Sequence, residues 1–227
     1  MAAVAGTLLL AACQQAPTST AASSRPAHSS APARSSPTPS ASPTSTPALA
    51  LDHVGATASP SGFLALAVIS NPSGMTALNV TVEISALDAS GGAMTRRSGT
   101  IQRIAPESRD AIALPFPVGR TLPSRFDATI KSVQWIADGQ PDAAQVTAAS
   151  FQQDARTPTV VAHVVTQGPS ADRVLLTAVC WDGAGAIRGG GSRTVTVPPG
   201  VQGHDEAIEV AISTLPARCD VFDVSLH

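Results

Sequence analysis

The chain contains one six-residue phrase twice, and this repetition constrains its fold more than any other feature. LPSRFD spans residues 122–127, and LPARCD spans residues 215–220. The sequences around Asp88 and Asp182 match as well, because each Asp follows a strand-like run and precedes a Gly-rich turn. The offset between the copies stays near 94 residues. Repetition at the length of a domain predicts two similar domains rather than a solenoid.

Each copy consists of short apolar runs that are separated by Gly, Pro, Asn and Asp. In one such run, Val80, Val82 and Ile84 alternate with polar residues, so one face of the strand should be buried and the other wet. The pattern predicts an all-β protein made of two tandem antiparallel β-sandwiches. They are assigned to residues 51–140 and 151–227, joined near residues 137–153.

Three features of this text are typical of one family of secreted proteins. They are the strand AVISN at residues 67–71, the pairs Leu87-Asp88 and Trp181-Asp182, and the Gly-rich turn after each pair. On these features the chain resembles FxLYD-type domains, and the second copy departs from the pattern with Gln167 in place of the Asn. The resemblance implies immunoglobulin-like sandwiches with a binding or structural role, and it implies no catalytic residues.

The first residues form a targeting segment. The apolar run from Ala2 to Ala12 has the length of a signal-peptide core and is too short to span a bilayer. Its last letters and the next residue, LAAC, resemble the bacterial lipobox, which implies a signal peptide at 1–12 and acylation of Cys13. No Lys or Arg precedes the run, so we expect the true start codon to lie upstream.

Residues 13–50 are built almost wholly from Ala, Pro, Ser and Thr. Such a segment has too little apolar surface to offset the entropy of ordering, so it is predicted to be a disordered linker. At about 3.1 Å per residue it would reach about 110 Å when extended. An acyl anchor followed by this linker predicts that the sandwiches lie outside the cytoplasm, anchored to the cell membrane by lipid.

One difference between the two copies of the repeated phrase is a cysteine in the second copy. Aligning the copies places Cys180 at the position of Ala86 and Cys219 at the position of Phe126. A small and a large apolar residue are thus replaced together by two cysteines, which suggests that the two positions touch across the core. In an oxidising compartment the pair would form a disulfide. The alternative is two free buried thiols.

One strand of the second copy is apolar on both faces. The outward face of this strand carries Leu175 and Val179 at positions where the first copy has polar or small residues, and Trp181 follows them. Exposed apolar patches usually mark contact surfaces, so these residues are a candidate partner-binding or interdomain surface. The alternative is that a loop or the first copy covers them, and Trp135-Ile136 is the candidate cover.

Composition and motifs exclude several functions. Charged residues are 13% of the chain and the only Lys is Lys131, so no basic footprint for nucleic acid exists. The text contains no catalytic motif. Gly189-Gly190-Gly191 is interpreted as a flexible connection, His204-Asp205-Glu206 as a solvated loop rather than a metal site, and His163 as structural. We expect no catalytic residues, no metal and no cofactor.

These observations favour a non-enzymatic binding or scaffold module of the cell envelope. Its expected partners are the membrane, through Cys13, and another envelope protein. One alternative is an accessory subunit of an envelope complex or sensor. The other is a hydrolase without a recognisable motif, which would need a convergent pair of buried ionisable groups in a cleft.

Overall fold

The computed structural model describes residues 46–117, 119, 121–137, 144–153, 157–166, 172–199 and 203–226. The predicted signal peptide, Cys13 and most of the linker lie outside these residues. The described part contains β-strands and no helix, which confirms the predicted all-β class. Within the same part, no helix is long and apolar enough to cross a membrane.

Six strands form the first sandwich. They are β1 (Ala50–Ser59), β2 (Gly62–Asn71), β3 (Thr76–Leu87), β4 (Ala93–Ile104), β5 (Ser108–Pro117) and β6 (Arg125–Ile136). One antiparallel sheet has the order β1-β2-β5, and the other has the order β4-β3-β6. Val80, Val82 and Ile84 are fully buried between the two sheets, as their alternation predicts.

The second sandwich repeats this topology. Its strands are β7 (Ala144–Gln153), β8 (Pro158–Thr166), β9 (Asp172–Trp181), β10 (Ile187–Val197), β11 (His204–Glu209), β12 (Ala211–Ile212) and β13 (Arg218–Ser225). The sheet β11-β8-β7 corresponds to β5-β2-β1, and the sheet β12-β10-β9-β13 corresponds to β4-β3-β6 with β12 added. The strand β7 occupies residues that the sequence assigns to the linker, so the second sandwich starts at Ala144.

The repeated phrase has the same backbone role in both copies. The N–H of Ser124 donates to the carbonyl oxygen of Leu87 at 2.8 Å, at the end of β3. The N–H of Ala217 donates to the carbonyl oxygen of Trp181 at 2.7 Å, at the end of β9. Each phrase therefore closes the chain onto the last residue of a central strand before the final strand of its sandwich begins.

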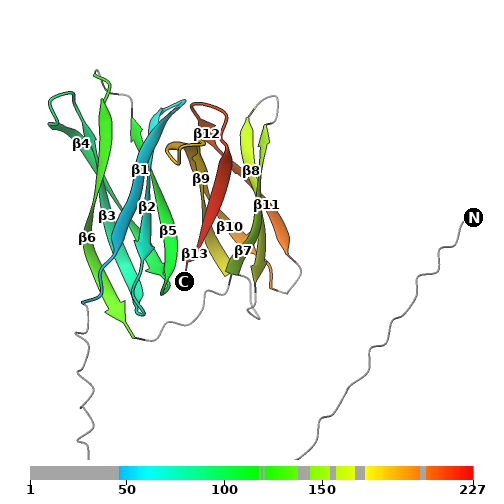
Figure 1. The fold of residues 1–227 in the computed structure, drawn as a ribbon. Coiled ribbons are helices and arrows are strands. Elements are labelled where there is room, and N and C mark those ends of the chain that lie inside the picture. Colours follow the sequence, from blue (N-terminus) through cyan, green and yellow to red (C-terminus); the bar gives the residue numbers. More distant parts are fainter. Residues whose placement is uncertain are drawn as a thin grey trace, which may run out of the picture. The chain divides into compact units, whose positions relative to one another are not determined.

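The two sandwiches pack against each other, so the described body is a stack of four sheets (Figure 1). The sheet β1-β2-β5 faces the sheet β12-β10-β9-β13 across a third apolar layer. That layer contains buried side chains of β2, β5, β9 and β10: Leu66, Val68, Ala111, Val179, Trp181 and Ile187. Strands β2 and β9 are consequently buried on both faces.

Two glycines let these middle sheets approach closely. A Cβ atom at Gly55 of β1 would lie 2.6 Å from the Cβ of Ile187, and one at Gly190 of β10 would lie 2.5 Å from Cδ2 of Leu66. Gly189-Gly190-Gly191 are part of β10 rather than a flexible connection, which corrects the interpretation from sequence. Small residues are needed there because neighbouring backbone and side chains fill the space of a side chain.

We expect Gly55→Ala to lower the free energy of unfolding by about 1–3 kcal/mol, because the added methyl group overpacks the layer against Ile187. Gly74→Ala is the matched control, since nothing lies within 4 Å of its Cβ position. Urea unfolding of both variants measures the difference. Equal stability of the two variants would show that the sandwiches do not pack in this way.

Candidate functional site

The two cysteines of the second copy are joined by a disulfide. Cys180 and Cys219 are directly opposite each other on β9 and β13, with a Cα–Cα distance of 4.0 Å. Ala86 and Phe126 are opposite each other in the same way on β3 and β6. The two positions therefore touch, but they touch along one sheet, and not across the core as the alignment suggested.

In the first copy an aromatic cluster takes the place of the disulfide. The ring of Phe126 lies 5.8 Å from the ring of Phe63 and 5.2 Å from that of Phe116, measured between centroids. Phe116 is buried and Phe63 is partly buried against the same core. Tilted and edge-on pairs at these separations are favourable contacts between aromatic rings.

The candidate partner surface is not free surface. Val179 and Trp181 have exposed fractions of 0% and 1%, because β2 and β5 of the first sandwich cover them. The cover is not Trp135, which packs on the core of its own sandwich. Trp181 also contacts His53, whose ring lies edge-on at 4.9 Å, and Arg218, whose Cζ lies 5.4 Å from the indole centroid.

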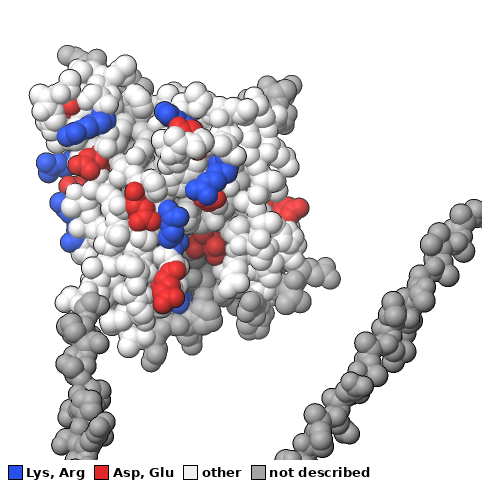
Figure 2. All heavy atoms as spheres, in the orientation of Figure 1, with Lys and Arg blue, Asp and Glu red and all other residues white. Residues whose placement is uncertain are grey.

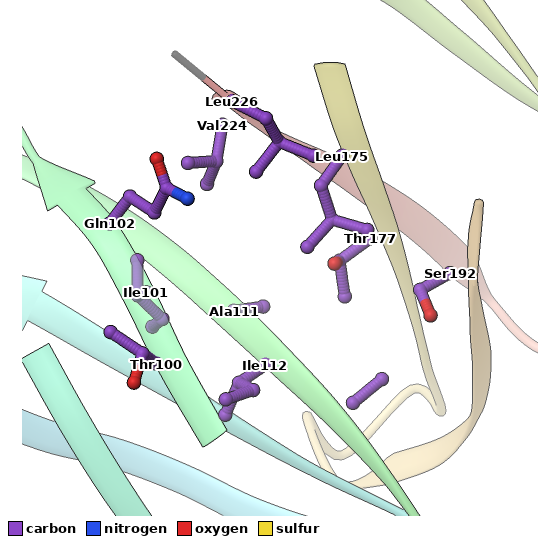
Figure 3. A pocket seen from close by; sticks show the side chains of 11 residues that line it. Thr100, Ile101, Gln102, Ala111, Ile112, Leu175, Thr177, Ser192, Val224 and Leu226 are labelled. Carbon is purple, nitrogen blue, oxygen red and sulfur yellow. The ribbon is translucent and has the colours of Figure 1, made fainter. Parts of the chain in front are cut away.

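Leu175 lines a small crevice between the sandwiches, with a volume of about 80 Å³. Figure 3 shows Leu175, Val224 and Leu226 on one side of it and Ile101 and Ile112 on the other. The lining mixes hydroxyl groups with aliphatic side chains and holds no charged residue. This interface crevice can hold a few water molecules, and it offers no group for acid–base chemistry.

A second hollow between the sandwiches contains charged side chains. Its volume is about 290 Å³, and its lining includes Arg103, Arg109, Asp110 and Asp223. Asp110 is 4% exposed, and its Oδ1 accepts a hydrogen bond from the N–H of Ala111 at 2.6 Å. Oδ1 of Asp223 accepts one from the N–H of Val146 at 3.3 Å. Both carboxylates thus accept hydrogen bonds from backbone N–H groups, and arginine side chains line the same hollow.

Asp88 and Asp182 organise equivalent turns. Oδ1 of Asp88 accepts hydrogen bonds from the Oγ of Ser90 at 2.6 Å and the N–H of Gly92 at 2.8 Å. These bonds hold the pKa of Asp88 below its usual value. The N–H of Ala186, followed by the guanidinium of Arg188, lowers the pKa of Asp182 in the same way. Both residues cap their own turns, as the sequence predicts.

The histidine and carboxylate groups of the second copy form separate pairs. Nδ1 of His163 lies 2.6 Å from Oδ1 of Asp205, its neighbour across β8 and β11. His204 lies 3.5 Å from Glu206. Figure 2 shows basic and acidic side chains interspersed over the face that it presents. Across the residues that the structure describes, no group of three potential ligands could hold a metal ion.

A hollow with a largely apolar lining lies at one end of the first sandwich. We call it the end pocket; its volume is about 300 Å³, and its lining includes Phe63, Met94, Thr95, Phe116, Gly119 and Pro123. Met94 is 38% exposed, and Leu122 beside the pocket is 66% exposed. A concave apolar space of this size suits one large side chain or a small ligand. No sequence motif marks this pocket, so the sequence alone did not indicate it.

Comparison with models of known protein families and with curated proteins finds no match to the chain.

Removal of the disulfide should cost about 4 kcal/mol of unfolding free energy, because it closes a loop of 39 residues in the unfolded chain. We expect this loss in the double variant Cys180→Ala/Cys219→Ala under oxidising conditions. The variant Cys180→Ala/Cys219→Phe copies the first sandwich, and it should recover about 1–2 kcal/mol. Recovery is partial because Pro158 and Val210 stand where the first copy has Phe63 and Phe116, so the new phenylalanine would lack aromatic neighbours. Denaturant unfolding measures both values, and no recovery would contradict the equivalence of the positions.

The charge of Asp88 and Asp182 should contribute stability only above acidic pH. Each folded pKa is lowered from about 3.8, so the contribution is present above that value and is lost as pH falls through the folded pKa. The variant Asp88→Asn/Asp182→Asn keeps Oδ1, which accepts from the N–H groups of the turns, and removes the charge together with the Oδ2 acceptor of Arg188. We expect it to be less stable than the wild type at pH 7, and we expect the difference to shrink as the pH falls below about 3.8, by urea unfolding. A constant difference at all pH values would argue against this origin.

Proposed function

We propose that the chain is a non-enzymatic cell-envelope lipoprotein that acts as a binding or scaffold module. The observation that carries this proposal is the sequence LAAC ending at Cys13, followed by an Ala-, Pro-, Ser- and Thr-rich segment and then by a compact body. Two or more acyl chains on Cys13 would anchor the protein stably in the membrane, whereas one chain binds reversibly.

The direction of the strands supports a display role. The chain enters the body at Ala50, and β1 then runs for ten residues to Ser59. Ser59 pairs with Gly62, and Gly62 pairs with Pro117 beside the end pocket. The end pocket is therefore about 30 Å from the point where the chain enters, at about 3.3 Å per residue. A partner bound there would meet the end of the first sandwich that is opposite the start of β1.

A second candidate is an accessory subunit of an envelope complex or sensor. The exposed side chains of Met94 and Leu122 beside the end pocket favour it, since apolar residues in a cluster are common at protein contacts. Co-purification from solubilised membranes distinguishes a bound subunit from a free-standing binding module. A hydrolase is the remaining alternative, and variants of Asp110 would test it.

We expect Cys13→Ser to abolish labelling by radioactive palmitate in a bacterial host and to move the protein from the membrane fraction to the soluble fraction. The reason is that only a thiol at this position can carry the anchoring acyl chains. Gln15→Ala is the matched control and should retain the label and the location. Label retained in Cys13→Ser would refute the lipid anchor, whatever the body binds.

A further inference from the structure

The two sandwiches dock head to tail. The sheet β1-β2-β5 of the first sandwich packs on the sheet β12-β10-β9-β13, which corresponds to the other sheet of its own sandwich. The contact therefore joins two different faces of the repeated unit and leaves one face of each kind free, at opposite ends of the stack (Figure 1). A head-to-tail contact that does not close into a ring can repeat without limit and form a filament. The residues on the two free faces therefore decide whether another copy of the chain can add.

We propose that residues on both free faces prevent this addition, so that the stack ends with one chain. The free face of the second sandwich lies on β11-β8-β7, and that of the first sandwich lies on β4-β3-β6. The proposal concerns assembly of the chain with copies of itself. It goes beyond the binding role proposed above, and it does not require that Cys13 be acylated.

A serine replaces a glycine on the free face of the second sandwich. On the docked face of the first sandwich, Gly55 of β1 pairs with Leu66 of β2. The matching pair is Ser150 of β7 with Val161 of β8, since each pair lies two residues beyond the irregularity in its strand pairing. A Cβ atom at Gly55 would lie 2.6 Å from the Cβ of Ile187. The side chain of Ser150 therefore prevents the close approach that the docked sheets achieve.

A polar pair lies on the same free face. In the docked face, Val68 pairs with Ala111, and both are buried in the layer between the sandwiches. The matching positions carry His163 and Asp205, whose Nδ1 and Oδ1 atoms lie 2.6 Å apart. The side chain of Asp205 is 71% exposed. Docking of another copy would remove water from both groups, and this desolvation disfavours the contact.

An arginine blocks the free face of the first sandwich. On the docked face of the second sandwich, Val179 precedes the disulfide and pairs with Gly190 of β10. The matching pair is Ser85 of β3 with Arg96 of β4, because Ser85 precedes the position that matches the disulfide. A Cβ atom at Gly190 would lie 2.5 Å from Cδ2 of Leu66. Docking in the same way therefore needs a glycine where the exposed Arg96 stands.

A charged pair lies on this face as well. The carboxylate of Glu83 is 3.1 Å from Nζ of Lys131. By register, Glu83 matches Thr177 of β9, which is 2% exposed. Both free faces thus carry charge or bulk at positions where the docked faces carry glycine, apolar residues or a buried threonine.

The inward faces of the same strands have not changed in this way. Ile69 and Ala67 of β2 are fully buried in the core of the first sandwich. Their matches by register, Val164 and Ala162 of β8, are fully buried in the core of the second. The polar substitutions are therefore confined to the face that would dock, which is why we assign them to the control of assembly.

The test restores the docking residues in two separate full-length variants, each made in the Cys13→Ser background to keep the chain soluble. The first is Ser150→Gly/His163→Val/Asp205→Ala. It gives the free face of the second sandwich the residues of the docked face of the first. Near-ultraviolet circular dichroism shows whether the packed core is retained.

The second variant is Glu83→Thr/Ser85→Val/Arg96→Gly, and Lys131→Ser removes the cation that Glu83 pairs with. In sedimentation equilibrium, each variant alone and the parent should remain monomeric, because each presents at most one restored face. An equimolar mixture should form a one-to-one complex, with a dissociation constant at least about tenfold below that of any unmixed sample.

The matched control for the first variant omits Ser150→Gly, so the serine still holds the sheets apart. It should associate with the second variant no more than the parent does. Association as strong as that of the complete variant would show a merely apolar surface and would overturn the proposal. So would a mixture of folded variants that stays monomeric, or a parent chain that assembles by itself.

The reverse change tests the same inference without building a new interface. Val68→His/Ala111→Asp places the blocking pair inside the docked layer, and Trp135→Phe leaves Trp181 as the only fluorophore of its kind. The sandwiches should separate, so that the emission of Trp181 shifts to the red and acrylamide quenches it, while far-ultraviolet circular dichroism keeps its strand signal. Val68→Ala is the control and should leave Trp181 shielded. A shielded Trp181 in the doubly polar variant would contradict the proposal, whatever Cys13 carries.

Discussion

The apolar layer between the two sandwiches is the contact on which the rest of the body depends. It buries Leu66 and Val68 of β2 against Val179 and Trp181 of β9, and glycines on both sides bring the sheets together. Burial of this kind contributes about 25 cal/mol for each Å² of apolar surface removed from water. Two sandwiches that share such a layer form one compact unit.

The same layer explains why the two copies have diverged on their outer faces. The outer face of β3 carries Thr81, Glu83 and Ser85, and Glu83 pairs with Lys131 at 3.1 Å. The matching face of β9 is apolar, because it is the face that docks on the first sandwich. On the far side of the second sandwich, β8 and β11 present His163 and Asp205 instead of an apolar surface. Polar outer faces end the stack after two units, as capping repeats do in longer arrays.

The sequence was a good guide to the strands and to the duplication, and a poor guide to the contacts between the copies. Alternation in Val80, Val82 and Ile84 gave the buried face of β3, and the repeated phrase gave the second sandwich. The run FLALAVI of β2 is covered on both faces, but the sequence analysis did not predict this cover, and periodicity alone does not say which partner covers a strand. Residues 144–153 read as linker because Ala, Ser and Gln are weak strand formers, and pairing with β8 overrides that preference.

The end pocket was beyond the reach of sequence motifs, because its lining comes from strands that are far apart in the sequence. Val179 and Trp181, which the sequence singled out with Leu175 as a surface for a partner or for the first copy, lie in the layer between the sandwiches. Whether the contact was inside the molecule or with a partner required the position of β2.

The direction of β1 has a mechanical consequence. A pull on the segment before Ala50, resisted by anything held at the opposite end, acts along the length of β1. The ten residues of β1 pair with β2 over nearly their whole length, so their hydrogen bonds would bear the load together in shear rather than break one after another. Resistance to such a force is a matter of unfolding rate rather than of equilibrium stability. Unfolding under such a pull would thus be slow, because the pairs between β1 and β2 would have to break together.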